Sequence, residues 1–260
     1  MAHVVVDDVV VTKHPASLRT ADLAVRLTAA TTDPIRPLYA APLAATPLAA
    51  PDGHLITLEP RLEPPGERPP WREIGSLIAR LQACPVPAGL PEHAGRALLT
   101  DAVARADRLH AGGPTDILRE LGRTLLRTWP TASDPVLVHG ALTLATVGRV
   151  PGTPSWLLSD PSTLGFGGPA WDLGAPAGMW AAGLLDTASW EACVDGYAEA
   201  GGSLPDAGDP WDALDHPARC WVYLTAVRQV AASGDYPDTE FSPQTQALLD
   251  ACVRMNGRSW

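Results

Sequence analysis

A proline-dense segment is the feature that most constrains how this 260-residue chain can fold. Residues 33–70 contain ten prolines, and a proline inside a helix removes a backbone donor and clashes with the preceding turn. No continuous helix can therefore cross this segment, although Gly53–Glu59 within it has the pattern of a single strand. We expect residues 1–62 to form a small β-rich lobe and residues 63–260 to form a larger, mostly helical lobe.

The local patterns on either side of this segment differ. At the start of the chain, His3–Val6 and Val9–Lys13 are runs of β-branched residues around Asp7-Asp8, which predicts a hairpin. Residues 136–140, 146–150 and 156–158 form a second β-like block. Helical spacing of apolar residues predicts helices at 17–30, 71–81, 92–110, 115–129, 171–184, 188–200, 211–232 and 243–255. The fold class that follows is α+β, in one bilobal domain.

Charge and cysteine usage exclude several classes of protein. With 19 Lys and Arg against 29 Asp and Glu, the net charge is −10, which disfavours nucleic-acid binding because that requires clustered positive charge. No stretch approaches the ~20 apolar residues of a membrane span, and the first residues lack the features of a signal peptide. Four widely spaced cysteines have no metal-binding spacing, so we expect reduced thiols and a cytoplasmic location.

Three short motifs follow one another between Val136 and Leu173. They are Val136-Leu137-Val138-His139-Gly140, then Trp156-Leu157-Leu158-Ser159-Asp160, then Gly167-Gly168-Pro169-Ala170-Trp171-Asp172-Leu173. Their order and spacing resemble the catalytic segment of aminoglycoside-phosphotransferase-like kinases, in which L-x-H-G-D-x-x-x-x-N precedes a strand ending in I-D and a G-x-P-x-x-D-L helix start. The resemblance implies a bilobal, protein-kinase-like fold.

The resemblance also implies a site for phosphoryl transfer from ATP with Mg²⁺. Such a site uses a lysine at the phosphates, a metal held by carboxylate and amide groups, and a carboxylate that accepts the hydroxyl proton. By resemblance, Lys13 contacts phosphate oxygens and Asp160 binds the metal, with Thr146 at the second metal position. His139 braces the catalytic loop, and Asp172 anchors it.

Four features of the family pattern are replaced or missing. Ala141 stands in place of the catalytic aspartate, and Thr146 in place of the metal-binding asparagine. One strand without a glycine-bearing phosphate loop precedes Lys13, and the following helix offers Asp22 where a glutamate is expected. Loss of a proton-accepting base typically costs ~10²–10⁴-fold in rate, although a loose transition state makes little early demand on proton removal.

Two functions are consistent with this combination of retained and replaced family residues. The first is an atypical ATP-dependent phosphotransferase subunit that modifies a hydroxyl of a small molecule or of Ser or Thr in a peptide, as in natural-product biosynthesis. Since the small lobe starts late, its hairpin should expose a strand edge, and we expect a partner protein to pair there and complete the site. The alternative is a pseudokinase that binds a peptide or a partner as a scaffold, for which Ala141 and Thr146 are the support.

Acidic residues dominate the region 191–240, where ten acids face two arginines. In the resembled family, acids of the helical lobe bind cationic substrates, and a field of one sign would attract them. A solvated acidic face would give the same pattern. The candidate substrate-binding residues are Asp195, Glu199, Asp212 and Asp215.

Ordinary structural roles remain open for the other candidates. Lys13 can be an exposed charge at a strand end, His139 a hydrogen-bonded core histidine, and Asp160 the start of a turn before a proline. Asp172 can cap a helix. Residues 165–170 also match the dinucleotide pattern G-x-G-x-x-A, but no βαβ alternation surrounds them, which disfavours a nicotinamide or flavin enzyme.

Overall fold

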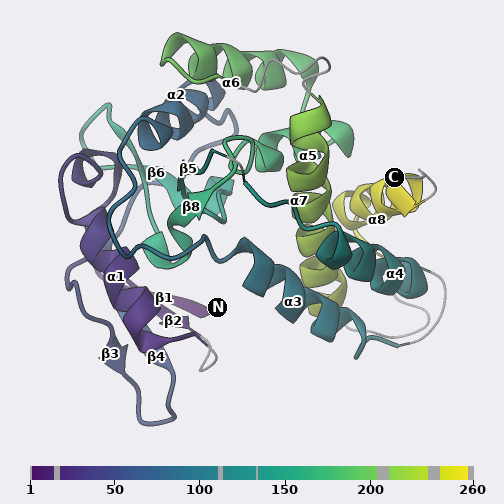
Figure 1. Cartoon of the computed structure of the whole chain (residues 1–260), viewed down its shortest axis with the longest axis horizontal. Coiled ribbons are helices and arrows are strands. Elements are labelled where there is room, and N and C mark those ends of the chain that lie inside the picture. Colours follow the sequence, from purple (N-terminus) through teal and green to yellow (C-terminus); the bar gives the residue numbers. More distant parts are fainter. Residues whose placement is uncertain are drawn as a thin grey trace. The chain divides into compact units, whose positions relative to one another are not determined.

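The computed structural model of the chain describes residues 2–14, 18–110, 114–132, 134–203, 211–233 and 241–256, with the backbone alone at residues 2, 3, 114, 211 and 212. The chain is α+β, with a small antiparallel sheet and many helices (Figure 1). It divides into two compact units. The first contains Met1–Ala94, Asp134–Pro169 and Cys193–Ser203, and the second contains Gly95–Ser133, Ala170–Ala192 and Leu204–Trp260. The expected boundary after residue 62 stays a prediction.

The sheet of the first unit has four antiparallel strands in the order β1-β2-β4-β3. Its strands are β1 (Ala2–Val6), β2 (Val9–His14), β3 (Leu48–Ala49) and β4 (Leu55–Pro60). The turn at Asp7-Asp8 joins β1 to β2, as the two valine runs predicted. Asp7 has a φ of 52°, a left-handed conformation that Asp adopts more readily than most residues.

The two faces of this sheet are different. Leu55, Thr57 and Glu59 alternate along β4 on a buried face. Helix α1 (Thr20–Ala30) packs Leu23 and Leu27 against Leu55 on that side. Because successive strand residues point to opposite faces, the residues between them lie on the other, partly exposed face.

The proline-dense segment contains no α-helix among its residues, all of which the structure describes. A 3₁₀ turn, η1 (Arg36–Leu38), is its one helical element. Backbone bonds also tie the segment to strands: the Ala40 N–H donates to the Leu158 carbonyl, and the Leu43 N–H donates to the Leu58 carbonyl. Helix α2 (Trp71–Gln82) begins directly after Pro70, where the apolar spacing predicted it.

The first unit also contains two short antiparallel pairs of strands. Strand β5 (Val136–Val138) pairs antiparallel with β8 (Gly165–Gly167), and β6 (Val147–Arg149) pairs with β7 (Trp156–Leu158). The 3₁₀ turns η2 (Leu144–Thr146) and η3 (Pro161–Thr163) lie between them. The β-like block is thereby confirmed. Residues 165–167 form a strand rather than a nucleotide-binding turn.

The second unit is helical. Its helices are α3 (Gly95–Ala106), α4 (Pro114–Arg127), α5 (Gly174–Ala181), α7 (Trp211–Ala232) and α8 (Pro243–Asn256), and α6 (Thr187–Glu199) runs from this unit into the first. Helix α7 contacts α3, α4, α5 and α8 and carries much of the core. None of the helices in the described ranges has the length and apolarity needed to cross a bilayer. All four cysteines are buried free thiols.

Candidate functional site

His139 braces the loop that follows β5. Its side chain is fully buried, and Nε2 lies 2.8 Å from the carbonyl oxygen of Ser159. A carbonyl only accepts, so Nε2 carries the proton and Nδ1 is the acceptor that faces the N–H of Ala141 at 3.4 Å. The ring also stacks on Tyr39, with centroids 5.9 Å apart. His139 therefore connects the loop to the residue that precedes Asp160.

Gly140 makes the sharp exit from β5 possible. Its φ is +90°, and a Cβ atom at this position would collide with the carbonyl oxygen of Thr163. The same Thr163 donates a hydrogen bond from Oγ1 to the carbonyl of His139 at 2.8 Å. The loop and the turn η3 thus approach each other so closely that only glycine fits between them.

Asp160 ends the β6–β7 hairpin with a left-handed backbone, at φ 53° and ψ 67°. Its Oδ1 accepts hydrogen bonds from the hydroxyl of Ser162 at 2.6 Å and from the Ser162 N–H at 3.4 Å. In the described part of the chain, no donor is hydrogen-bonded to Oδ2. Since Asp160 is only half-buried, this oxygen is open to a further ligand.

Glu59 places a second carboxyl group beside Asp160. Its Oε2 accepts a 2.6 Å hydrogen bond from the backbone N–H of Asp160. The residue is only 3% exposed, and Oε1 has no hydrogen-bond partner in the described ranges. Burial, together with the negative charge of Asp160, raises the pKa of Glu59 to about 8. The resemblance to the kinase family gave no indication of this carboxyl.

Arg26 and His93 are two buried basic residues in the first unit. Arg26, on α1, donates from Nη1 to the Leu164 carbonyl at 2.7 Å and from Nη2 to the Glu92 carbonyl at 2.9 Å. Its burial lowers the pKa of the guanidinium. Burial, with a contribution from the charge of Arg26, lowers the pKa of His93 to about 3. Arg26 therefore connects α1 to Glu92 and to Leu164, which lies between η3 and β8.

Lys13, the sole lysine of the chain, lies on the other face of the sheet. It is opposite Ile56 in the register of β2 and β4, three residues from Glu59 and so on the opposite face. Its Nζ pairs with Oδ2 of Asp52 at 2.5 Å. This position and pairing give no support to the expectation that Lys13 and Asp160 both hold the nucleotide, which stays a prediction. Asp22, which stands where the resembled family has a glutamate, pairs with Arg19 at 3.9 Å.

Thr146 and Ala141 occupy the positions of the missing family residues. The hydroxyl of Thr146 donates to the Thr143 carbonyl at 3.0 Å and accepts from the Thr143 N–H at 2.9 Å. It therefore caps η2, and the metal role expected of it stays a prediction. Ala141 contributes a methyl group, which cannot accept a proton.

Asp172 belongs to the second unit and is almost fully buried. It directly precedes Leu173, the residue at which α5 is capped. This position fits a structural role at the start of α5. Its expected role as an anchor of the His139 loop stays a prediction.

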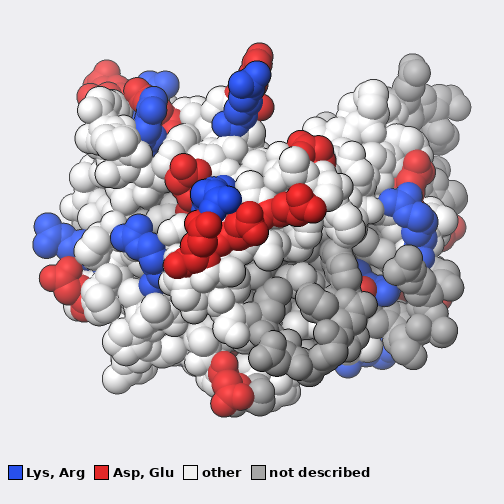
Figure 2. Space-filling model, turned by 90° about the horizontal axis from the view of Figure 1, so that it is seen from above, with Lys and Arg blue, Asp and Glu red and all other residues white. Residues whose placement is uncertain are grey.

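The acidic substrate candidates already have basic partners. Asp195 and Glu199 both pair with Arg72 of α2, at 3.2 and 2.5 Å. Figure 2 shows acidic side chains gathered in a band on one face, with basic side chains beside them. An open groove of about 290 Å³ lies along these helices, lined by Arg72, Glu73, Ser76, Gly196, Glu199 and Ala200.

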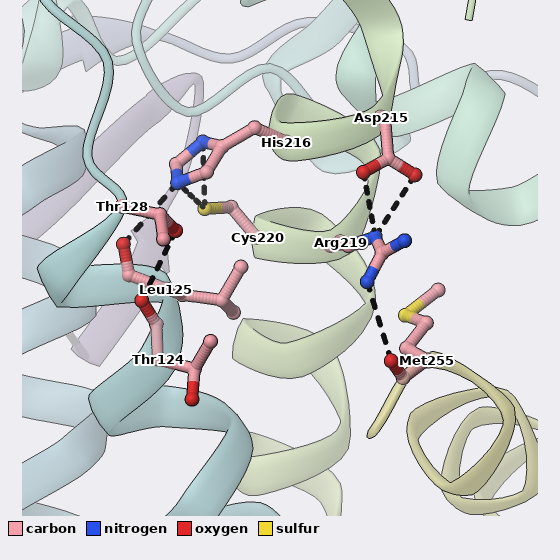
Figure 3. A network of polar contacts seen from close by, with 8 residues as sticks. All are labelled: Thr124, Leu125, Thr128, Asp215, His216, Arg219, Cys220 and Met255. Atoms are coloured by element: carbon pink, nitrogen blue, oxygen red, sulfur yellow. Dashed lines mark hydrogen bonds and ion pairs between the residues drawn. The ribbon is translucent and has the colours of Figure 1, made fainter. Parts of the chain in front are cut away.

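Asp215 pairs with Arg219 at 2.8 Å, and Arg219 also donates to the Met255 carbonyl (Figure 3). This network fastens α8 to α7 within the second unit. The side chain of Asp212 lies outside the described residues. The three described acids are thus committed to arginines of the chain, and their role in substrate binding stays a prediction.

The oxygen atoms at Asp160 fit a divalent cation. Mg²⁺ is commonly held by one or two carboxylates and completes its shell with waters and substrate phosphates. Oδ2 of Asp160 and Oε1 of Glu59 are two such oxygens without protein donors in the described ranges. Within those ranges no cluster of three or more His, Cys, Asp or Glu side chains could hold a metal.

The chain matches no protein-family model and no curated protein, but its fold matches solved structures. Choline kinase LicA from Streptococcus pneumoniae has a TM-score of 0.60 at 10% identity, over 96% of this chain and 86% of that chain. An aminoglycoside phosphotransferase from Alicyclobacillus acidocaldarius has a TM-score of 0.57 at 11% identity, over 98% and 88%. The phosphotransferase APH(3'')-Id from Streptomyces rimosus, in complex with ADP and streptomycin, has a TM-score of 0.52 at 19% identity, over 85% and 86%.

These matches confirm the fold expected from the three motifs. The chain has the aminoglycoside-phosphotransferase-like, protein-kinase-like fold, with a small β-rich lobe and a helical lobe. The matched structures, by their names, include enzymes that transfer phosphate to small molecules.

Sequence reasoning missed Glu59, Arg26 and His93. A signal for Glu59 was present, since it lies four residues after Leu55 on the same side of a predicted strand. A charged residue at a core-facing position requires a partner when buried. The partner, Asp160, could not be identified because it lies in a remote part of the sequence. No comparable signal marks Arg26 or His93.

Proposed function

We propose that this chain is an atypical ATP-dependent phosphotransferase subunit that transfers phosphate to a hydroxyl of a small molecule or of Ser or Thr in a peptide. The observation that carries the proposal is the built conformation around Asp160. This residue keeps a left-handed backbone and an open Oδ2, and His139 holds its neighbour Ser159 through Nε2. The likeness to phosphotransferases of small molecules supports the same reading at the level of the fold.

The chain itself does not supply the full set of groups for the reaction. Ala141 cannot take the hydroxyl proton, so another molecule must accept it. Loss of such a base slows transfer by ~10²–10⁴-fold, but a loose transition state tolerates late proton removal. When bound, Mg²⁺ would neutralise the phosphates, and Asp160 is the residue of this chain that would hold it.

We further propose that a protein partner contributes at β1. In the described ranges, the outer edge of β1 has no neighbouring strand. Val4, Val5 and Val6 are all more than half exposed, which leaves apolar surface on both sides of this edge. An open edge with exposed valines is suited to pairing with a strand of another chain.

Calorimetric titration of the purified chain with ATP tests the proposal. We expect ATP to bind in the presence of Mg²⁺ and not in the presence of a chelator. Asp160→Asn should abolish this binding, since Asn retains the left-handed backbone but carries no charge. Glu63→Gln, which removes an exposed acid paired with Arg149, is the matched control. Absence of Mg²⁺-dependent ATP binding would refute the proposal.

A second candidate is a pseudokinase that binds a peptide or partner as a scaffold. The pairing of Lys13 with Asp52 and the methyl of Ala141 favour it. Transfer of labelled phosphate to hydroxyl acceptors, with co-purified partners present, separates the two functions. If ATP binds but no transfer occurs, the scaffold is supported. Ala141→Asp should then produce ATP hydrolysis if residue 141 lies beside the reacting phosphate.

A further inference from the structure

We propose that Glu59 is a metal-binding residue, and that its Oε1 and Oδ2 of Asp160 together hold one divalent cation. Glu59 would then provide the second ligand that Thr146 does not provide. The role of this cation, which would neutralise the phosphates of ATP, rests on the proposed function. The binding of the cation itself can be measured without nucleotide.

The burial of Glu59 supports a bound cation. A carboxyl group that is 97% removed from solvent loses its hydration, and structures almost always compensate such a group with partners. Here only Oε2 is compensated, by the N–H of Asp160. Among the described residues nothing is bonded to Oε1. A buried oxygen left in this way points to a ligand that the polypeptide does not supply.

The two carboxylate oxygens of Asp160 support the same cation site. Its carboxylate is fixed through Oδ1 by the hydroxyl of Ser162, and Oδ2 is unoccupied by protein donors in the described ranges. The bond from the Asp160 N–H to Oε2 fixes Glu59 in turn. Each carboxyl therefore uses one oxygen for orientation and keeps the other for a ligand, as metal-binding carboxylates commonly do.

The charges of the neighbouring Glu59 and Asp160 carboxyls also favour a cation. Two neighbouring carboxyls repel each other when ionised. The nearest guanidinium on α1, that of Arg26, is committed to two backbone carbonyls, and Lys13 lies on the opposite face of the sheet. A divalent cation relieves this repulsion and matches two hard oxygen ligands. Its remaining positions would be left for water and phosphate oxygens, as Mg²⁺ prefers.

Thr146, at the second metal position of the resembled family, is hydrogen-bonded within its own loop. The Thr146 hydroxyl is engaged by the backbone of Thr143 on both its donor and acceptor sides. A single carboxylate at Asp160 would hold Mg²⁺ weakly, because the ion is reluctant to lose its waters. Glu59, supplied by β4, is the carboxylate that contacts Asp160 directly.

The test is a titration of nucleotide-free, chelator-treated protein with MnCl₂, with free Mn²⁺ followed by electron paramagnetic resonance. We expect one bound Mn²⁺ per chain. Glu59→Gln should weaken this binding by about tenfold or more, and Asp160→Asn should do the same. Glu63→Gln should bind as the wild type does, since it removes an exposed acid paired with Arg149. Calorimetry with MgCl₂ repeats the comparison with the proposed ion.

The melting temperature shows whether each variant is folded. Glu59→Gln has nearly the same shape and removes a buried acid, so its melting temperature should be no lower than that of the wild type. Glu59→Asp keeps a carboxylate on a shorter side chain and should show an intermediate Mn²⁺ affinity. Equal affinity in the wild type and Glu59→Gln, or absence of Mn²⁺ binding by the wild type, overturns the inference.

Failure of the metal site and failure of the phosphotransferase proposal give different experimental results. Binding of Mn²⁺ that requires Glu59, with no phosphate transfer to any hydroxyl acceptor, retains the metal site and refutes the phosphotransferase. Phosphate transfer that is undiminished in Glu59→Gln retains the phosphotransferase and refutes the metal site.

Discussion

The backbone N–H of Asp160 donates a 2.6 Å hydrogen bond to the carboxyl of Glu59, a residue 101 positions earlier in the chain. This bond joins β4 of the small sheet to the end of the β6–β7 hairpin. A hydrogen bond of this kind contributes about 0.5–1.5 kcal/mol to stability. The position of Asp160 is therefore set jointly by its own turn, through Ser162, and by a strand of the sheet.

Gly140→Ala should destabilise the protein by about 2 kcal/mol or more. The substitution places a Cβ atom against the Thr163 carbonyl and forces alanine into a φ of +90°. Urea unfolding followed by circular dichroism measures the change. Gly168→Ala is the matched control, because open space surrounds its Cβ position. Equal stabilities of the two variants would contradict the close approach of the loop to η3.

Arg26→Gln should cost about 3 kcal/mol of folding free energy. The variant leaves the carbonyls of Leu164 and Glu92 without their donor, and each unsatisfied buried group costs about 1–3 kcal/mol. Arg19→Gln, at the exposed start of the same helix, should change stability by less than about 1 kcal/mol. Chemical unfolding of both variants gives the comparison. A small effect of Arg26→Gln would show that α1 does not depend on these bonds.

His93 should make the folded state sensitive to acid. Its folded pKa is lowered to about 3, whereas an unfolded histidine titrates near 6.5. Between these values the unfolded chain binds the additional proton, so stability is present above pH 6.5 and falls as the pH decreases toward 3. His93→Gln should lose about 2 kcal/mol less than the wild type between pH 7.5 and pH 4.5. Urea unfolding at the two pH values measures this, and an equal loss in both proteins would contradict the assignment.

Lys13→Met should leave the Mg²⁺-dependent affinity for ATP unchanged. Lys13 lies on the face of the sheet opposite Glu59 and forms a half-exposed pair with Asp52, and such exposed pairs contribute little to stability. Calorimetric titration with ATP checks the affinity. Because this is the sole lysine, amine labelling and mass spectrometry provide a second measurement. Loss of affinity, or protection of Lys13 by ATP, would place its ammonium at the phosphates.

Much of the fold could be predicted from local sequence patterns. The hairpin at Asp7-Asp8, the strand β4 and the helix α2 each follow from the spacing of apolar residues within a dozen positions. The three motifs between Val136 and Leu173 indicated the kinase-like fold that the structural matches confirm. Strand β8 was missed because three residues rich in glycine carry no β pattern of their own.

The candidate site was predicted less completely. His139 and Asp160 belong to two successive motifs of the resembled family, so their proximity through Ser159 could be expected from the resemblance. The face on which Lys13 lies depends on its register with β4, and a shift of one residue would reverse it. Glu59 meets Asp160 only because two separate strands end near each other.

The sequence by itself determined the elements and the fold class, because helical and strand periods and the hairpin turn are properties of neighbouring residues. It also excluded the catalytic base, since Ala141 has no group that accepts a proton. Only the tertiary structure decided that Glu59 joins Asp160, that Thr146 is engaged by its own loop, and that Lys13 pairs with Asp52 on the other face. The physical reason is that strand register and burial, which set the partners of each polar group, arise from residues far apart in the chain.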